Sequence, residues 1–201
     1  MTVIGLTGGS GAGKGAVCQK FRALNIDSID TDLTSRQVCA PNTPCLKELV
    51  DTFGDTILFE DGSLDRRGLA AIVFADKQKL DTLNKITHRY ILEEVRLWLD
   101  GQRAMGKKAA IVDAPLLFES GFDKECDVII SVIARRDIRL KRIIARDGIT
   151  EAAAITRLNK QGDDSFYTSR SDYIITNNGD PSLLDPQIKH IYDKLMGRTP
   201  Q

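Results

Sequence analysis

The stretch TVIGLTGGSGAGKG, residues 2–15, decides the fold of this chain. Its first part is short, mostly apolar and followed by glycines, which predicts a buried β-strand that ends in a turn. Apolar residues then recur at helical intervals at Val17, Phe21 and Leu24. The sequence therefore predicts a strand, a glycine-rich turn and a helix in direct succession.

The segment Gly8 to Lys14 matches the phosphate-loop pattern G-x-x-x-x-G-K. Glycines let successive backbone N–H groups point at a phosphate, and the helix N-terminus adds partial positive charge. We expect this P-loop to bind ATP, with Lys14 bridging the β- and γ-phosphates. A flexible glycine loop is the alternative. The expected nucleotide contacts are Gly8, Gly9, Gly11, Ala12, Gly13, Lys14, Gly15 and Ala16.

Position 15 departs from the usual pattern, which places Ser or Thr there as a ligand of magnesium. This chain has Gly15. Two interpretations stay open: other groups hold the metal through water, or the protein binds nucleotide and turns it over poorly.

Further short, apolar, β-branched runs alternate with helical patterns, which indicates a parallel sheet covered on both faces. The sequence thus predicts an α/β fold, the three-layer P-loop NTPase architecture, with a five-stranded parallel sheet. The four other expected strands are residues 26–30, 109–114, 127–134 and 171–176.

The segment between the second and third strands is too long for a simple crossover, so we expect a helical subdomain there. Thr43 and Pro44 are typical of a helix N-cap and first turn, and Gly54 of a helix end. Apolar residues at helical intervals also predict one long amphipathic helix from Asp76 to about Met105.

Charge and composition exclude several classes of partner. The chain has 201 residues, and its 28 basic residues balance 28 acidic ones, which disfavours binding to nucleic acid or an anionic membrane. No apolar stretch is long enough to span a bilayer, and no secretory leader is recognisable. The 4 cysteines match no zinc or redox spacing. We expect a cytoplasmic protein with reduced cysteines.

Three aspartates follow expected strands, at the sheet edge where ligands of parallel sheets bind. Asp30 and Asp32 follow the second strand, and Asp113 closes the third. We expect one of the first pair to accept a proton from an attacking hydroxyl and the other to help organise a metal and its waters. All three are candidates to hold magnesium, through its water shell. Helix capping by the first two, and a turn role for Asp113, are the alternatives.

Four arginines, at positions 135, 139, 142 and 146, recur at helical spacing and predict one cationic stripe. Like charges stacked in this way repel each other unless an anion lies among them. A migrating phosphoryl group is such an anion, so the stripe fits a lid over a triphosphate. A solvated helix face is the alternative.

Several segments taken together resemble the dephospho-CoA kinase family along nearly the whole chain. The loop alone is common to many NTPases, whereas the D-x-D pair followed by R-Q-V and the P-L-L-F-E segment are more specific. The segments are GLTGGSGAGKG (5–15), IDTDLTSRQV (29–38), GSLDR (62–66) with LNKITHRYI (83–91), DAPLLFESG (113–121), and RIIARDG, RLNKQ and ITNNGD within 142–180.

This resemblance implies transfer of a phosphoryl group from ATP to the 3′-hydroxyl of dephospho-CoA, the last step of coenzyme A synthesis. It also implies a division of the single kinase domain into three parts. These are a core of residues 1–32, 107–137 and 171–201, a helical acceptor-binding insertion of 33–106, and a helical lid of 138–170.

The resemblance further implies roles for individual residues. Asp32 and Lys14 resemble catalytic residues, and Arg142 and Arg146 resemble catalytic residues of the lid. Arg142 also resembles a nucleotide contact, and Asn177 a residue near the adenine. The residues that resemble acceptor contacts are Asp32, Arg66, His88, Leu117 and Glu119.

Two departures accompany the resemblance. Gly15 and Ala16 replace a pair of hydroxyl residues, and Arg89 replaces a proline, which we expect to affect only the start of a helix. Two other functions stay open: a nucleoside or nucleotide kinase of the same fold, and a nucleotide-binding regulatory module with weakened catalysis. His88 alone is as typical of a structural histidine. We expect a monomer or weak homo-oligomer.

Overall fold

The structure is a computed structural model, and it describes residues 1–197. The described chain divides into two compact units. The helical unit is Asp30–Trp98, and the core unit comprises Met1–Ile29 and the residues from Leu99 onward.

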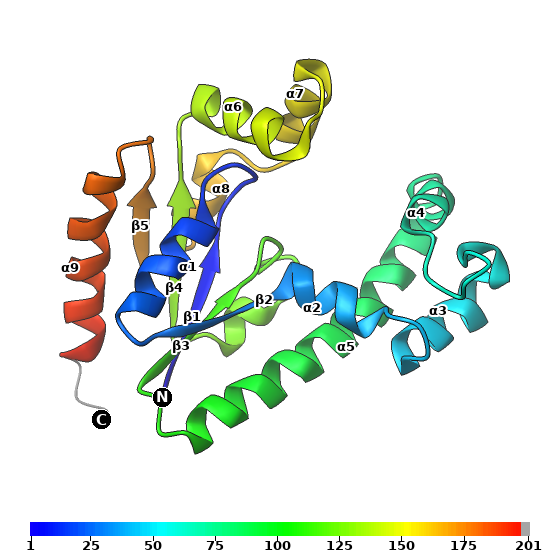
Figure 1. The fold of residues 1–201 in the computed structure, drawn as a ribbon, viewed down its shortest axis with the longest axis horizontal. Helices are drawn as coiled ribbons and strands as arrows, with labels where there is room; N and C mark the ends of the chain where they lie inside the picture. The colour runs from blue at the N-terminus through cyan, green and yellow to red at the C-terminus, as the bar shows by residue number, and fades with distance from the viewer. Residues whose placement is uncertain (198–201) are drawn as a thin grey trace. The chain divides into compact units, whose positions relative to one another are not determined.

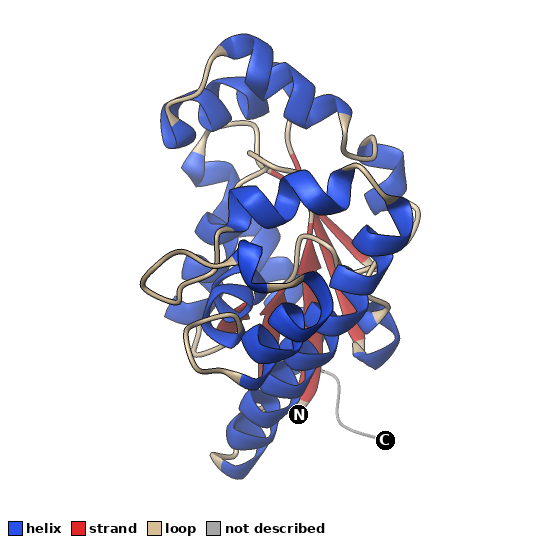
Figure 2. Cartoon of the chain, turned by 90° about the vertical axis from the view of Figure 1, so that its right-hand side faces the viewer, coloured by secondary structure: helices blue, strands red, loops and turns tan. Residues whose placement is uncertain are grey.

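The core unit is built on a single sheet with strand order β2-β3-β1-β4-β5, flanked by helices (Figures 1 and 2). Its strands are β1 (Thr2–Thr7), β2 (Asp27–Asp30), β3 (Ala109–Asp113), β4 (Val128–Ile133) and β5 (Tyr173–Thr176). β1 pairs in parallel with β3 and β4, and β4 pairs in parallel with β5. The predicted α/β fold with a parallel five-stranded sheet is confirmed, with strand bounds within two residues of those expected.

β1 lies at the centre of the sheet, and its two faces meet different layers. Ile4 and Leu6 point into the core beneath the helices α1 (Lys14–Ala23) and α9 (Leu184–Met196). Gly5 points to the opposite face, where an added Cβ would lie 2.8 Å from the Leu117 side chain. Alternate residues of a strand face opposite sides, so a strand buried on both sides reads as a continuous apolar run.

Three helices lie between β4 and β5 in the chain: α6 (Arg136–Asp147), α7 (Glu151–Asn159) and α8 (Asp164–Thr168). In Figure 1, α6 and α7 lie beyond the carboxyl ends of the central strands, on the side where the turn between β1 and α1 also lies. Ile143 of α6 packs with Ala154 and Leu158 of α7. The remaining short elements of this unit are the 3-10 helices η2 (Phe122–Glu125) and η3 (Pro181–Leu183).

The helical unit has its own core, in which Leu49 and Ile57 are fully buried. Its elements are α2 (Thr31–Val38), α3 (Pro44–Phe53), η1 (Asp55–Ile57), α4 (Arg66–Phe74) and most of α5 (Lys77–Ala104). The Thr43 hydroxyl accepts a hydrogen bond from the Leu46 N–H at the start of α3, and Gly54 ends that helix at φ 84°. The predicted caps and the long helix are therefore confirmed.

Arg89 corrects one expectation, because it lies in the interior of α5 and not at the start of a helix. Its guanidinium pairs with Glu48 of α3, whose carboxylate also accepts a hydrogen bond from the Tyr90 hydroxyl at 2.8 Å. The arginine thus ties α5 to α3. Among the described residues, no helix combines the length and the apolar character that crossing a membrane requires.

Candidate functional site

The glycines of the loop between β1 and α1 are required by its geometry. Gly8, Gly11 and Gly13 have φ values of 140°, 78° and 95°, which L side chains rarely adopt. An added Cβ at Gly8 would lie 2.2 Å from the Val132 carbonyl oxygen, and one at Gly11 would lie 2.6 Å from the Arg139 carbonyl oxygen. The backbone therefore wraps more tightly than other residues permit.

The N-terminus of α1 offers backbone donors to a ligand. Gly13 is its N-cap, and no described side chain caps the helix. By contrast, α2 and α3 are capped by Asp30 and Thr43. The first-turn N–H groups of a helix have no partner inside the helix, and they carry its partial positive charge. This end of α1 is suited to an anion such as phosphate.

Arg142 of α6 and Asn177, which follows β5, brace the loop between β1 and α1. We call the side of the loop that these two residues contact its outer side, and the opposite side its inner side. Arg142 donates to the carbonyl oxygens of Gly11 and Ala12, both at 3.2 Å, and to the Asn177 side-chain oxygen at 3.1 Å. The Asn177 amide donates to the Ala12 carbonyl oxygen at 2.9 Å. A trans peptide points its N–H opposite to its C=O. The braced Ala12 carbonyl therefore directs the Gly13 N–H to the inner side.

A second brace, which we term the Arg139–Gln161 latch, holds Ser10. Arg139 donates to the Ser10 carbonyl oxygen at 3.0 Å, and the Gln161 side-chain oxygen accepts from the Ser10 N–H at 2.8 Å. Arg139 also donates to that Gln161 oxygen, at 2.8 Å. The arginine is 7% exposed. The helical spacing in the sequence singled out Arg139. Gln161 belonged to the RLNKQ segment of the family resemblance, but no role was predicted for it.

The arginine stripe is only partly confirmed. Arg139, Arg142 and Arg146 all reach the loop, the last with its Nη2 3.5 Å from the Ser10 hydroxyl. Arg135 does not belong to the stripe: it precedes α6 as the N-cap, and its guanidinium pairs with Asp137. The loop carbonyls that accept from Arg139 and Arg142 therefore relieve the repulsion between the stacked guanidiniums.

Arg146 has an acidic partner next to it in the chain. It pairs with Asp147, to which Arg157 of α7 also binds. The hydrogen bond from Arg146, with the charges of both arginines, lowers the pKa of Asp147 to about 2. Asp147 is therefore ionised at neutral pH and partly offsets the positive charge of the two arginines.

Lys14, the first residue of α1, points back across the loop towards β3. Its Nζ lies 3.4 Å from the Gly8 carbonyl oxygen and 3.8 Å from Oδ1 of Asp113, the last residue of β3. Cys18 approaches the other carboxylate oxygen at 3.7 Å. Burial, with the Asp113 charge, raises the pKa of Cys18 to about 12, so this thiol stays protonated. Asp113 thus lies beside the loop lysine at the end of β3, and its role towards magnesium stays a prediction.

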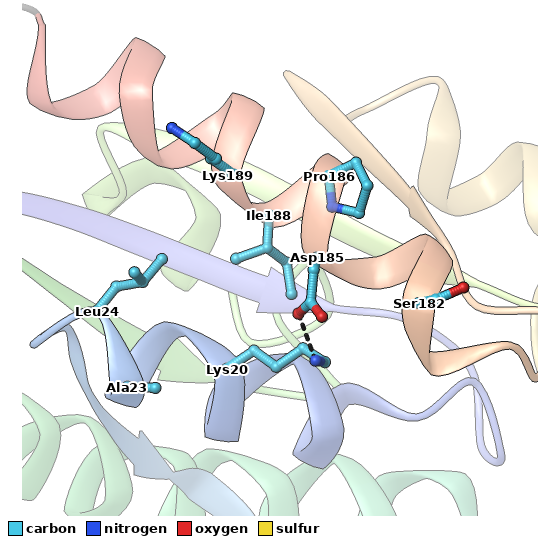
Figure 3. Close-up of a pocket in the computed structure, with 8 residues that line it drawn as sticks. All are labelled: Lys20, Ala23, Leu24, Ser182, Asp185, Pro186, Ile188 and Lys189. Atoms are coloured by element: carbon cyan, nitrogen blue, oxygen red, sulfur yellow. Dashed lines mark hydrogen bonds and ion pairs between the residues drawn. The ribbon is translucent and has the colours of Figure 1, made fainter.

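Two cavities of the core unit lie away from the inner side of the loop. One of about 630 Å³ lies between α1 and the start of α9 (Figure 3), where Leu24 and Ile188 line it and Lys20 pairs with Asp185. The other, of about 410 Å³, borders the Arg139–Gln161 latch on the α7–α8 side. Neither is lined by a glycine of the loop, so neither is the phosphate cradle itself.

The helical unit contains three of the expected acceptor residues. Asp32 is exposed in the first turn of α2, and His88 is half-buried within α5. Arg66 is exposed as the first residue of α4, with Nη2 3.5 Å from the Ser35 carbonyl oxygen. Their contacts with a substrate stay predictions.

Asp30 acts as a helix cap, which was the alternative to a metal or catalytic role. Its Oδ1 accepts from the N–H groups of Asp32 at 2.8 Å and Leu33 at 3.2 Å. This bonding occupies one carboxylate oxygen and fixes the start of α2. It leaves the Asp32 carboxylate as the better candidate for proton transfer.

Comparison with known proteins identifies the family of this chain. The family model described as dephospho-CoA kinase matches residues 2–182. The chain belongs to the dephospho-CoA kinase family. It is 37% identical to the dephospho-CoA kinase of Corynebacterium efficiens, over 98% of this chain and 99% of that protein. It is 38% identical to that of Moorella thermoacetica, over 97% and 92%. The solved dephospho-CoA kinase of Campylobacter jejuni, 26% identical, superimposes with a TM-score of 0.71 over 98% of both chains.

Membership confirms the predicted P-loop kinase, with dephospho-CoA kinase activity in the final step of coenzyme A biosynthesis. A family of kinases also implies ATP as a substrate. The alternative of a kinase for a different nucleoside is not supported.

Two residues of the P-L-L-F-E segment have different surroundings. Leu117 has no exposed surface and packs beneath Gly5 of β1. Its side chain is part of the core in this structure, and its assignment as an acceptor contact stays a prediction. Glu119 is exposed, so its assignment stays a prediction. An apolar residue near a strand end carries no sequence signal that separates packing from substrate contact.

Proposed function

We propose that this dephospho-CoA kinase transfers the γ-phosphoryl group of ATP to the 3′-hydroxyl of dephospho-CoA by means of residues in both of its units. The observation that carries the proposal is the glycine loop, wrapped at positive φ, braced from outside by Arg142 and Asn177, and followed by an uncapped helix. Preorganised backbone donors cost no reorganisation when charge develops on the phosphates.

The core unit holds the nucleotide in this proposal. N–H groups at the start of α1 bind the β-phosphate, and the Lys14 ammonium lies between the β- and γ-phosphates. Arg142 and Arg146 neutralise charge that grows on the transferring group, and Asn177 contacts the adenine. Phosphoryl transfer spreads charge over three oxygens, so positioned cations act most strongly on the transition state.

The helical unit holds the acceptor. Asp32 accepts the proton of the attacking hydroxyl, while Arg66 and His88 bind the acceptor's anionic groups. Glu119 is a further proposed acceptor contact. An exposed carboxylate suits the first role, because the hydroxyl acidifies only as it attacks. An exposed guanidinium at a helix start suits the second, since it binds phosphate in a bidentate manner.

The residues of this chain suit a magnesium ion whose ligands are mainly the nucleotide phosphates and water. Within residues 1–197, no group of three His, Cys, Asp or Glu side chains lies close enough to hold a metal. Mg²⁺ usually binds through one or two carboxylates, phosphate oxygens and several waters. We propose that Asp113 and Asp32, with the second oxygen of the Asp30 carboxylate in support, hold it through water. The ion would neutralise phosphate charge.

The Gly15→Ser variant tests both the catalysis and this account of the metal. An added Cβ at Gly15 meets no atom within 4 Å, so the serine fits without strain. We expect the wild type to use dephospho-CoA but to need more free magnesium than Gly15→Ser. The restored hydroxyl supplies a ligand that water otherwise replaces. Initial rates against magnesium concentration measure the shift.

Gly15→Ala is the matched control, because it adds the Cβ without the hydroxyl and should follow the wild-type curve. Coincident curves for the serine and wild-type forms would show that position 15 does not face the metal. A wild type that is inactive at every magnesium concentration, beside an active serine form, would favour the regulatory module.

We further propose a cytoplasmic enzyme that acts as a monomer or weak homo-oligomer and binds neither nucleic acid nor membrane. The equal numbers of acidic and basic residues, 28 of each, support this. A polyanion-binding surface usually needs a clear excess of positive charge. The anions of this protein are instead small substrates held by local groups.

A further inference from the structure

Two cysteines of the helical unit lie side by side and take no part in the phosphoryl transfer. Cys39 is the C-cap of α2, and Cys45 lies in the first turn of α3. Their sulfur atoms are 3.7 Å apart, which is contact distance. The exposed fractions of the two residues are 4% and 1%, within the apolar core of this unit.

The surroundings make the two thiols unequal. Hydrogen bonding by the Cys45 thiol, together with the nearby positive charge of Arg66, lowers the pKa of Cys39 to about 7. The same hydrogen bond, burial and the charge of Glu48 raise the pKa of Cys45, against the opposing charge of Arg89. Only the thiolate is nucleophilic. We therefore expect Cys39, the sulfur beside the Arg66 cation, to attack and Cys45 to act as the resolving thiol.

We propose that Cys39 and Cys45 form a reversible disulfide when the protein meets hydrogen peroxide, and that this disulfide weakens acceptor binding through Arg66. In the first step the Cys39 thiolate attacks one peroxide oxygen, the O–O bond breaks, and Cys39 becomes a sulfenic acid as hydroxide leaves. In the second step the Cys45 sulfur attacks Cys39, the S–O bond breaks and the S–S bond forms. The Cys45 proton leaves with the hydroxyl as water, so two thiols and one peroxide give one disulfide and two waters.

Formation of the bond needs only a local movement. The sulfur atoms must approach from 3.7 Å to about 2.05 Å. The chain between them is a short turn with Asn42 at φ 67°, outside both helices. Turns and helix ends open more readily than helix interiors, which admits a molecule as small as peroxide to a buried sulfur.

The disulfide reaches Arg66 through α2. In the reduced protein Arg66 interacts with Cys39 and donates to the Ser35 carbonyl oxygen. Ser35 lies in the C-terminal half of α2, and Cys39 is the C-cap of that helix. Formation of the disulfide bond draws this end of α2 towards α3. Arg66 then loses one partner and shifts from the other. This second part of the proposal rests on the proposed acceptor role of Arg66.

The chemical part is tested without any activity measurement. The full-length protein is treated with graded hydrogen peroxide, alkylated, digested with trypsin and analysed by mass spectrometry. Cleavage after Arg36 and Lys47 places both cysteines in one peptide, while Cys18 and Cys126 fall in separate peptides. We expect the shared peptide to resist alkylation and to weigh two hydrogens less. Dithiothreitol should restore alkylation. Alkylation of Cys39 and Cys45 that persists at all peroxide levels would overturn the proposal.

The functional part compares oxidised and reduced enzyme. We expect the KM for dephospho-CoA to rise several-fold on oxidation, the KM for ATP to stay unchanged, and dithiothreitol to reverse the change. Cys45→Ser should abolish the response, and Cys126→Ser should retain it, because Cys126 lies in the core unit. The same response in Cys45→Ser, or a disulfide without any change in KM, would refute the link to Arg66.

Failure of this inference differs from failure of the proposed function. If dephospho-CoA is not an acceptor at all, the peptide analysis still decides whether the disulfide forms. If a Cys45→Ser preparation does not fold, Cys39→Ala, which removes the attacking sulfur at the helix cap, gives the same test. Protection of the shared peptide in Cys39→Ala would overturn the proposal.

Discussion

Replacing Lys14 with alanine is expected to reduce kcat with dephospho-CoA by about a hundredfold to a thousandfold, the scale for removing one preorganised charge-stabilising group. The lysine is the first residue of the uncapped helix, and its Nζ lies 3.4 Å from the Gly8 carbonyl oxygen. A charge at the β- and γ-phosphates acts mainly on the transition state, so the effect falls on kcat. Initial rates at saturating ATP measure it.

The fold should survive this substitution. The lysine's approach to Asp113 is long, at 3.8 Å, and the Asp113 carboxylate keeps its contact with the Cys18 thiol. Lys20→Ala is the matched control on the same helix, because that lysine only pairs with Asp185 at the surface. Normal turnover in Lys14→Ala would remove this lysine from the transfer step, and equal losses in both variants would indicate general damage to α1.

Replacing Asp32 with asparagine is expected to lower kcat at least about a hundredfold, with ATP affinity nearly unchanged. Asparagine keeps the size of the side chain and removes its basicity. The residue is exposed in the first turn of α2, whose start is already fixed by Asp30. Loss of the carboxylate should therefore leave the helix in place. Single-turnover rates and ATP binding separate the two effects.

Asp30→Asn is the informative control for that variant. Asparagine caps helices about as well as aspartate, so α2 should stay intact and turnover should change far less than in Asp32→Asn. If Asp30→Asn abolishes turnover while Asp32→Asn does not, the general base is the first aspartate of the pair. Stability is followed by thermal unfolding of both variants.

The parts of this fold that could be predicted from the sequence were those with a strong local cause. Glycines at positive φ, a threonine–proline helix start and apolar runs bounded by turns each impose a local conformation. The phosphate loop and the cap at Thr43 therefore follow from a few adjacent residues. Their physical requirements do not depend on the rest of the chain.

Other features depended on contacts between distant segments and could not be predicted. Gln161 binds Ser10 across 151 positions of sequence, and nothing near either residue signals the contact. Leu117 is buried because Gly5 leaves room for it, which spacing within one segment cannot reveal. Arg135 fits the helical period but precedes the helix. Periodicity places residues on a face only once the helix bounds are known.

ADP release with alternative acceptors tests the central claim most directly. Wild-type enzyme is supplied with ATP, magnesium and one of dephospho-CoA, adenosine or AMP, and the product of each reaction is identified by mass spectrometry. The account predicts rapid ADP release with dephospho-CoA, matched by formation of coenzyme A, and far slower release with the other two. Equal use of adenosine, or ADP release with dephospho-CoA without coenzyme A, would contradict it.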